Sequence, residues 1–186
     1  MAKDKMKEYD LVAFCNTLVD YVTNIDENDV SQYGLRKGDF REIDKRTKSK
    51  IESKFNIEKF VGGSGANVAY GVSNLGLNAL YIATVGDDEN SDFYIRNSKK
   101  ENLDLYCIEK NGDTGVAVTL ITPDKERSFG VFYGVMKKLK EKDLPNNIIG
   151  NAKNFFITLY AIDLNPKIAI KAMDLAKGRV CLDLSS

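Results

Sequence analysis

The sequence predicts an α/β fold in which a mostly parallel sheet is flanked by helices. Short apolar runs, typical of buried strands, alternate with segments that repeat their apolar residues at helical spacing. Two strand-like runs are separated by a short segment that contains the turn pair Pro123-Asp124, which predicts a hairpin off the main sheet. The resulting order is strand, helix, strand, helix, strand, hairpin, strand, helix, strand.

The strands are predicted from apolar runs, most of them rich in β-branched or aromatic residues. Residues 16–42 are mixed in composition and rich in turn residues, so no regular element is assigned there. The predicted strands are 9–15, 79–86, 103–108, 113–122, 127–134, 154–160 and 179–184.

The helices are predicted from apolar residues three or four positions apart and from their end signals. Residues 44–55 carry Ile51 and Phe55 on one face, with Asp44 as the N-cap. The remaining charges of that helix predict a solvated face rather than an anion-binding patch, because acids are interspersed with bases. The other predicted helices follow the glycines of 62–65 up to Gly76, cover 90–101, and run from Pro166 to about residue 177.

Composition excludes several classes of function. The 186 residues predict one domain, and 43% hydrophobic residues suffice for a sizeable core. Lys plus Arg equals Asp plus Glu at 27 each, which argues against a nucleic-acid or membrane-surface binder. The absence of histidine removes histidine-based catalysis and histidine metal sites.

Cellular location follows from the cysteines and the N-terminus. Cys15, Cys107 and Cys181 are far apart and form no CxxC pair, so buried reduced thiols are expected. Reduced thiols, a charged N-terminus without a signal core, and no run of membrane-spanning length together predict a cytoplasmic protein.

The glycine-rich stretch GGSGAN (62–67) precedes a predicted helix, yet it matches neither standard phosphate fingerprint. Glycines allow a backbone to approach a ligand closely, and a helix N-terminus offers free N–H groups. The alternative is a tight strand-to-helix turn capped by Asn67, and these residues alone leave both interpretations open. Asp20, after the first strand, suits a sugar diol because a carboxylate accepts two hydrogen bonds, although taken alone it is better interpreted as a plain turn residue.

Together these motifs resemble the ribokinase/PfkB family of carbohydrate and nucleoside kinases, with a tilt toward adenosine-kinase-like members. The similar segments occur in the family's order and span nearly the whole chain after residue 9. They are Asn16 with Asp20, LRKGDFREID (35–44), GGSGANVAYGVSNLG (62–76), TVGDD (84–88), TGVAVTLITPDKERSF (114–129) and VCLDLSS (180–186).

The resemblance implies a ribokinase-like, Rossmann-type fold with a small β-sheet lid built from segments near 17–42 and 115–133. It implies that a sugar or nucleoside, such as ribose or adenosine, is phosphorylated with ATP and Mg²⁺. The substrate hydroxyls would be held by the side chains and backbone of Asn16, Asp20, Gly62, Gly63 and Asn67.

Other assignments stay open. Arg127 would either face the transferred phosphate or be a solvent-exposed turn residue, whereas Asp87 and Asp88 are interpreted as a turn and a helix N-cap. The lid would join two copies into a homodimer or act as a monomer's flap. Two positions depart from the family pattern: Cys15 replaces a glycine, and no glycine precedes the aromatic Tyr160.

The resemblance places the nucleotide site and the general base in a Gly-Ala-Gly-Asp turn, which this sequence lacks. We therefore expect residues 1–186 to be the N-terminal, substrate-binding portion of a longer kinase, without catalytic residues or a metal site and inactive alone. The alternatives are a non-catalytic sugar- or nucleoside-binding or dimerisation module and, as a weaker third, a nucleotide-binding α/β domain.

Overall fold

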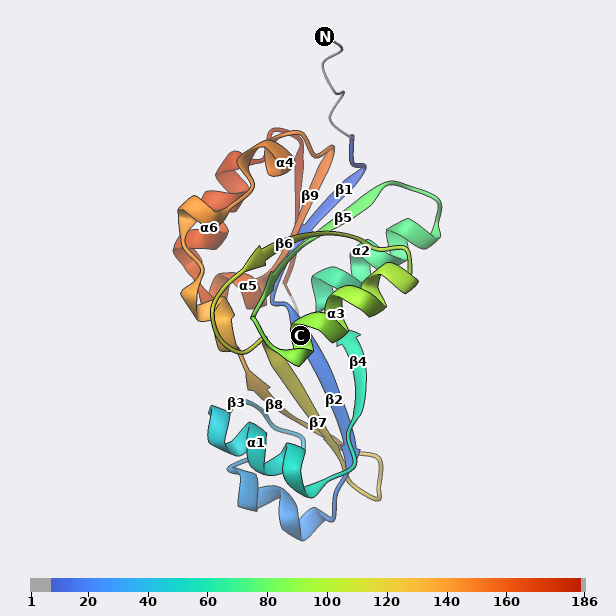
Figure 1. The fold of residues 1–186 in the computed structure, drawn as a ribbon, viewed down its shortest axis with the longest axis vertical. Coiled ribbons are helices and arrows are strands. Elements are labelled where there is room, and N and C mark those ends of the chain that lie inside the picture. The colour runs from blue at the N-terminus through green and yellow to red at the C-terminus, as the bar shows by residue number, and fades with distance from the viewer. Residues whose placement is uncertain (1–7, 185–186) are drawn as a thin grey trace.

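The computed structural model describes residues 8–184 and contains two five-stranded sheets (Figure 1). The larger sheet is parallel throughout, in the order β10-β9-β1-β5-β6. Its strands are β1 (Leu11–Phe14), β5 (Ala79–Val85), β6 (Asp104–Glu109), β9 (Asn154–Thr158) and β10 (Arg179–Asp183). This architecture confirms the predicted α/β class.

Helices cover both faces of the larger sheet, as Figure 1 shows. Strand β1 alternates between the two cores: Leu11 and Ala13 pack in one apolar cluster and Val12 and Phe14 in the other. The first face carries α2 (Ser64–Asn74) and α3 (Glu89–Lys100), and the second carries α4 (Asn146–Gly150), α5 (Leu159–Leu164) and α6 (Pro166–Leu175). Burial on both faces explains why the strands read as continuous apolar runs.

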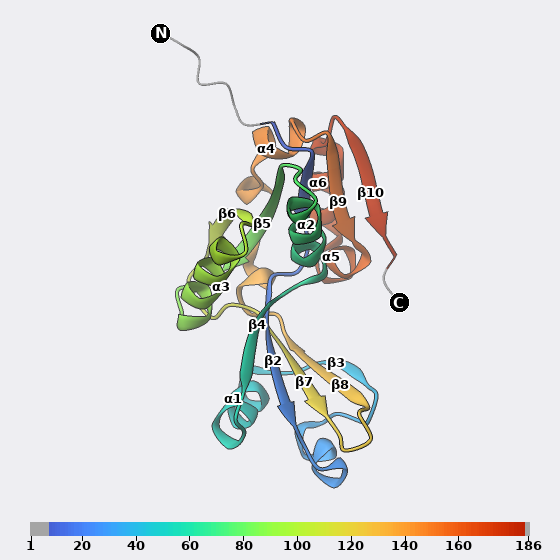
Figure 2. The same ribbon diagram turned by 90° about the vertical axis from the view of Figure 1, so that its right-hand side faces the viewer.

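The second sheet is mixed, in the order β3-β8-β7-β2-β4, and extends away from the first (Figure 2). Its strands are β2 (Leu18–Asn24), β3 (Phe40–Glu42), β4 (Glu58–Gly62), β7 (Val116–Ile121) and β8 (Arg127–Phe132). One face packs on α1 (Lys45–Lys54) and the 3₁₀ helix η1 (Glu27–Tyr33) through the core residues Tyr21, Tyr33 and Ile51. Two further 3₁₀ helices, η2 (Gly134–Lys138) and η3 (Glu141–Asp143), follow β8.

Three details of the sequence analysis are wrong. Residues 16–42, to which composition assigned no regular element, contain strands β2 and β3, as the family resemblance implies for a β-sheet lid. Strand β4, which follows α1, is not predicted. The strand predicted to reach residue 160 ends at Thr158, because Leu159 already begins α5.

Across residues 8–184, no helix has the length and apolar character needed to cross a membrane.

The N-cap of α3 also ties the two sheets together. The Asp88 carboxylate accepts hydrogen bonds from Ser91 N (3.1 Å), Thr114 N (3.0 Å) and Thr114 Oγ1 (2.6 Å). Thr114 is fully buried just before β7. The N-cap of α1, Asp44, caps its own helix by accepting from Thr47 N at 2.7 Å.

Asp88→Ala is therefore expected to lower the free energy of unfolding by about 2–4 kcal/mol, since it removes a cap and leaves buried Thr114 donors unpaired. Asp44→Ala is the matched control and should cost about 1 kcal/mol. Urea denaturation of both variants measures the difference. Equal losses would show that the Thr114 bonds contribute nothing.

Candidate functional site

A cavity of about 210 Å³ lies where the carboxyl end of β1 meets the second sheet. Four of the predicted site residues line it, although they come from two distant segments of the sequence: Asn16, Asp20, Gly63 and Asn67. Gly62 does not line the cavity, but it lies against the carboxylate of Asp20, which does. The other lining residues are Cys15, Leu18, Phe40, Ser64, Val131, Tyr133 and Tyr160.

Asp20 is the charged group of this cavity. It lies on β2, between Phe60 of β4 and Ala117 of β7. Burial raises the pKa of its carboxyl to about 6, and none of the cationic side chains in the described part of the chain pairs with it. Asp20 is half-buried, and a partly desolvated carboxylate without a partner is unfavourable in the free protein, so the site is suited to a ligand that donates hydrogen bonds.

Gly62 and Gly63 are glycines for steric reasons. A Cβ on Gly62 would collide with the Asp20 carboxylate, and one on Gly63 would lie 2.5 Å from the carbonyl oxygen of Asn16. Gly63 also has a φ of +96°, which side chains rarely tolerate. These two positions bring the N-terminus of α2 close to Asp20.

The interpretation of Asn67 as a helix cap is wrong. The N-cap of α2 is Gly63, with no side-chain cap, and Asn67 lies within the first turn with its backbone N–H bonded to Gly63 O at 3.0 Å. Its side chain is exposed and lines the cavity. The N–H groups of the first turn and the Asn67 amide therefore face the same space as Asp20.

Asn16 is only 6% exposed, and part of its hydrogen-bonding capacity is used within the protein. Its Nδ2 donates to the backbone oxygen of Tyr160 at 3.1 Å. This bond joins the β1–β2 connection to the first turn of α5. Asn16 thus positions Tyr160, and its amide oxygen is the atom left for a ligand.

A cluster of small polar side chains forms the floor of the cavity. The Cys15 Sγ lies 2.9 Å from Thr158 Oγ1 and 3.2 Å from Ser64 Oγ, and the Tyr81 hydroxyl donates to Cys15 O at 3.0 Å. Cys15 also packs against Gly65, where a Cβ would lie 2.6 Å from its own. The buried thiol predicted at Cys15 is confirmed, while Cys107 and Cys181 are half-buried and also unpaired.

Of the aromatic residues of the cavity, Tyr160 is named from the sequence only as a departure from the family pattern, and Phe40 and Tyr133 are not assigned to the site. Phe40 stacks on Tyr160 with ring centroids 5.7 Å apart and an interplanar angle of 23°, and Tyr133 lines the same wall. Phe40 belongs to the three-residue edge strand β3, which carries no strand pattern of its own. Only the pairing of β3 with β8 places Phe40 beside the cavity.

Arg127 does not line the cavity. It begins β8, opposite Ile121 in the β7–β8 hairpin, and its exposed guanidinium lies 5.8 Å from the Phe129 ring. Its role toward phosphate stays a prediction.

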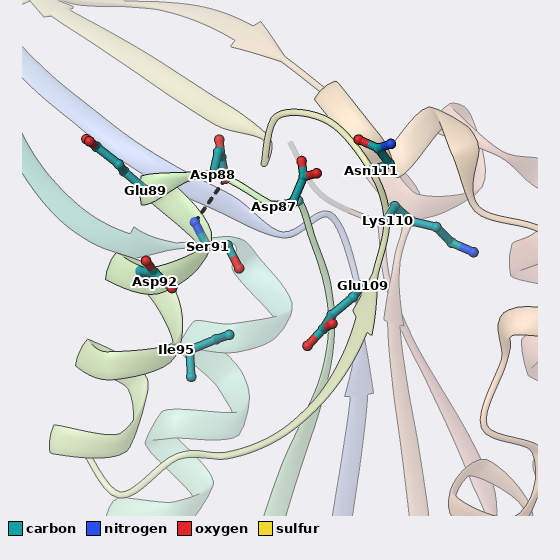
Figure 3. Close-up of a pocket in the computed structure, with 10 residues that line it drawn as sticks. Asp87, Asp88, Glu89, Ser91, Asp92, Ile95, Glu109, Lys110 and Asn111 are labelled. Atoms are coloured by element: carbon teal, nitrogen blue, oxygen red, sulfur yellow. Dashed lines mark hydrogen bonds between the residues drawn. The ribbon is translucent and has the colours of Figure 1, made fainter.

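A second hollow of about 960 Å³ lies between α3 and the carboxyl ends of β5 and β6 (Figure 3). Two of the five carboxylates that line it are engaged within the protein: Asp88 caps α3, and Asp87 accepts from Gly112 N at 2.7 Å. This confirms that both are turn and cap residues. Lys110 at its rim pairs with Asp143 at 2.7 Å. The smaller cavity is the better candidate because four of the predicted substrate-binding residues line it together.

Comparison with known proteins places these features in one family. The model of the pfkB family of carbohydrate kinases matches residues 28–182. The chain is 33% identical over 129 residues to a 5-dehydro-2-deoxygluconokinase of Clostridium perfringens, covering 66% of this chain and 38% of that protein. A Clostridium tetani protein of the same name is 31% identical over 144 residues, with coverages of 72% and 42%.

Solved structures share the fold. An adenosine kinase from Sinorhizobium meliloti superposes with a TM-score of 0.84 at 23% identity, over 97% of this chain and 57% of that one. A probable sugar kinase protein from Rhizobium etli gives 0.84 at 21% identity, over 95% and 56%. The chain thus spans about two fifths of the length of these curated relatives and little more than half of these solved structures.

Proposed function

Because the chain belongs to the pfkB family of carbohydrate kinases, we propose that its protein transfers the γ-phosphoryl group of ATP to a hydroxyl group of a sugar or nucleoside. Residues 8–184 would form the substrate-binding part. The observation that carries the proposal is the Asp20 carboxylate, which lies half-buried in a cavity of substrate size without a partner among residues 8–184. Hydroxyl groups of a substrate would supply the hydrogen bonds that the free protein lacks.

The second sheet would act as a lid over this substrate. Asp20 would accept hydrogen bonds from two adjacent hydroxyls, and Asn67 and the first-turn amides of α2 would hold others. Among the described residues no lysine or arginine lines the cavity, so a neutral polyol fits it better than an anion. The curated relatives are named as kinases of a gluconate derivative, which favours a sugar-derived substrate over a nucleoside, although gluconate carries the carboxylate that this lining disfavours.

ATP and Mg²⁺ do not fit the residues present. The sequence has no Gly-rich phosphate loop of either standard type, and within residues 8–184 no group of three potential ligands could hold a metal ion. Since the sequence also lacks the Gly-Ala-Gly-Asp turn, we propose that these 186 residues bind the substrate without turning it over.

A binding screen tests the proposal. The chain is titrated calorimetrically with D-ribose, D-fructose, 5-dehydro-2-deoxy-D-gluconate and adenosine. Binding of at least one ligand at a single site is expected, with the affinity lost in Asn67→Ala and kept in Asn111→Ala, an asparagine that lines the other hollow. Failure of the chain to bind any polyol would contradict the proposal.

Substrate affinity should depend on pH through Asp20. The ionised carboxylate is the better acceptor for two hydroxyls, and its pKa in the free protein is about 6. The dissociation constant should therefore be constant above pH 7 and about tenfold higher at pH 5, one unit below that pKa. Calorimetric titrations of the bound sugar between pH 5 and 8 measure this, and a flat profile would exclude Asp20 as the acceptor.

The lid is also the surface that we propose for a homodimer. Phe60, on edge strand β4, has half of its surface exposed on the face that carries Asp20. Light scattering should report a dimer that Phe60→Ser converts to a monomer. A monomeric wild-type chain at millimolar concentration would leave the lid as a monomer's flap.

A further inference from the structure

Phe40 and Tyr160, here called the aromatic pair, connect the second sheet to the larger one across the cavity. Phe40 comes from β3, at the edge of the second sheet, and Tyr160 from the first turn of α5, directly after β9. Their rings stack at 5.7 Å and 23°, and both side chains line the cavity. One end of the cavity is thus closed by an aromatic contact between two separate elements.

The aromatic pair lies at the end away from Asp20. In the second sheet β2, which carries Asp20, is separated from β3 by β7 and β8. At the usual spacing of neighbouring strands, three steps place the two backbones about 14 Å apart. A polyol whose hydroxyls are held by Asp20 therefore points its other end toward the aromatic pair.

The two rings differ in how strongly the surrounding protein fixes their positions. Tyr160 is anchored, because its backbone oxygen accepts the hydrogen bond from the buried Asn16. Phe40 is 51% exposed, and all residues of β3 are exposed. A substrate with a bulky group at this end would have to displace Phe40 and forfeit the stacking contact.

We infer that the aromatic pair sets the size of the substrate: it admits a polyol of monosaccharide size and excludes one that carries an aromatic base at that end. This inference rests on the proposed function of the cavity and makes Phe40 its specificity-determining residue. Opening the pair should admit adenosine, which is ribose with such a base attached.

The test measures adenosine binding to wild type, Phe40→Ala, Tyr160→Ala and Phe129→Ala, alongside the sugar bound in the screen. Phe129 is the matched control, because its ring lies 6.4 Å from Phe40 on β8 and does not line the cavity. Phe40→Ala and Tyr160→Ala should each bind adenosine at least tenfold more tightly than wild type. Phe129→Ala should stay within twofold of wild type.

The outcomes separate this inference from the proposed function. Variants that bind the sugar but still exclude adenosine would overturn the inference alone, as would a wild-type chain that already prefers adenosine. A wild-type chain that binds no sugar and no nucleoside would overturn both. Circular dichroism checks that each variant is folded. Phe40→Ala and Tyr160→Ala each remove one ring of the aromatic pair, so either variant tests the inference if the other does not fold.

Discussion

Asp20→Asn is expected to weaken substrate binding at least a hundredfold while making the free protein more stable. Binding weakens because two hydrogen bonds to a charged acceptor are lost, each contributing about 1.5–3 kcal/mol. Stability rises because the wild-type carboxylate is half-buried without a partner among the described residues, and this desolvation raises its pKa from 3.8 to about 6. Removing that charge should add about 1–3 kcal/mol to the free energy of unfolding at pH 8.

The pH dependence has a definite sign. Because the pKa of Asp20 is higher in the folded than in the unfolded chain, its ionisation opposes folding above about pH 6, and the penalty fades as the pH falls toward 3.8. The stability difference between Asp20→Asn and wild type should therefore be largest at neutral pH and vanish near pH 4. Urea denaturation across this range measures it.

Asp124→Asn is the matched control with the opposite sign. Hydrogen bonds from Lys37 and Thr122 lower the pKa of Asp124 to about 2, so its charge stabilises the fold above pH 3.8. The control should therefore destabilise the protein at neutral pH and leave substrate binding unchanged. An Asp20→Asn variant that is less stable than wild type, or that binds the sugar equally well, would contradict our account of the site.

Gly63→Ala is expected to lower the free energy of unfolding by about 3 kcal/mol. A side chain at a φ of +96° is strained by about 1–3 kcal/mol, and its Cβ would lie 2.5 Å from the carbonyl oxygen of Asn16. The N-terminus of α2 would have to move away from β1, so sugar affinity should fall as well.

Gly71→Ala provides the control within the same helix. Gly71 lies inside α2, and nothing is found within 4 Å of where its Cβ would stand. This substitution should stabilise the protein by about 0.5–1 kcal/mol, because glycine is unfavourable inside a helix. Thermal unfolding of the two variants compares them, and a Gly63→Ala variant as stable as wild type would show that the turn does not need glycine.

The larger sheet could be predicted from the sequence because its signals are local. Strand β5 is buried along its whole length and therefore reads as an unbroken apolar run. Helix α6 begins at Pro166, and its apolar residues follow helical spacing. Each of these elements carries its own pattern and its own end signals.

The second sheet could not be predicted in the same way. Strand β3 has three exposed residues, and β4 alternates between exposed and half-buried side chains with two charges among them. Both acquire strand geometry only by pairing, β3 with β8 and β4 with β2, across more than thirty residues of chain. Their assignment depends on contacts that no local pattern records.

The same distinction applies to the residues of the candidate site. Asp20 and Gly63 could be selected from the motif resemblance, and the structure brings them to one cavity. The contact between Phe40 and Tyr160 could not, because a surface-strand phenylalanine and a helix tyrosine meet only after both sheets have formed. The polar half of the site was therefore predictable, and the aromatic contact was not.

The central claim is that Asp20 accepts the hydroxyl groups of the substrate. Carbon-13 NMR of the Asp20 carboxyl, titrated with and without a saturating sugar, tests it most directly. Our account predicts a pKa of about 6 in the free protein and a lower value in the complex, because the hydroxyls bind the ionised form. A free pKa near 3.8, or one that the bound sugar leaves unmoved, would contradict it.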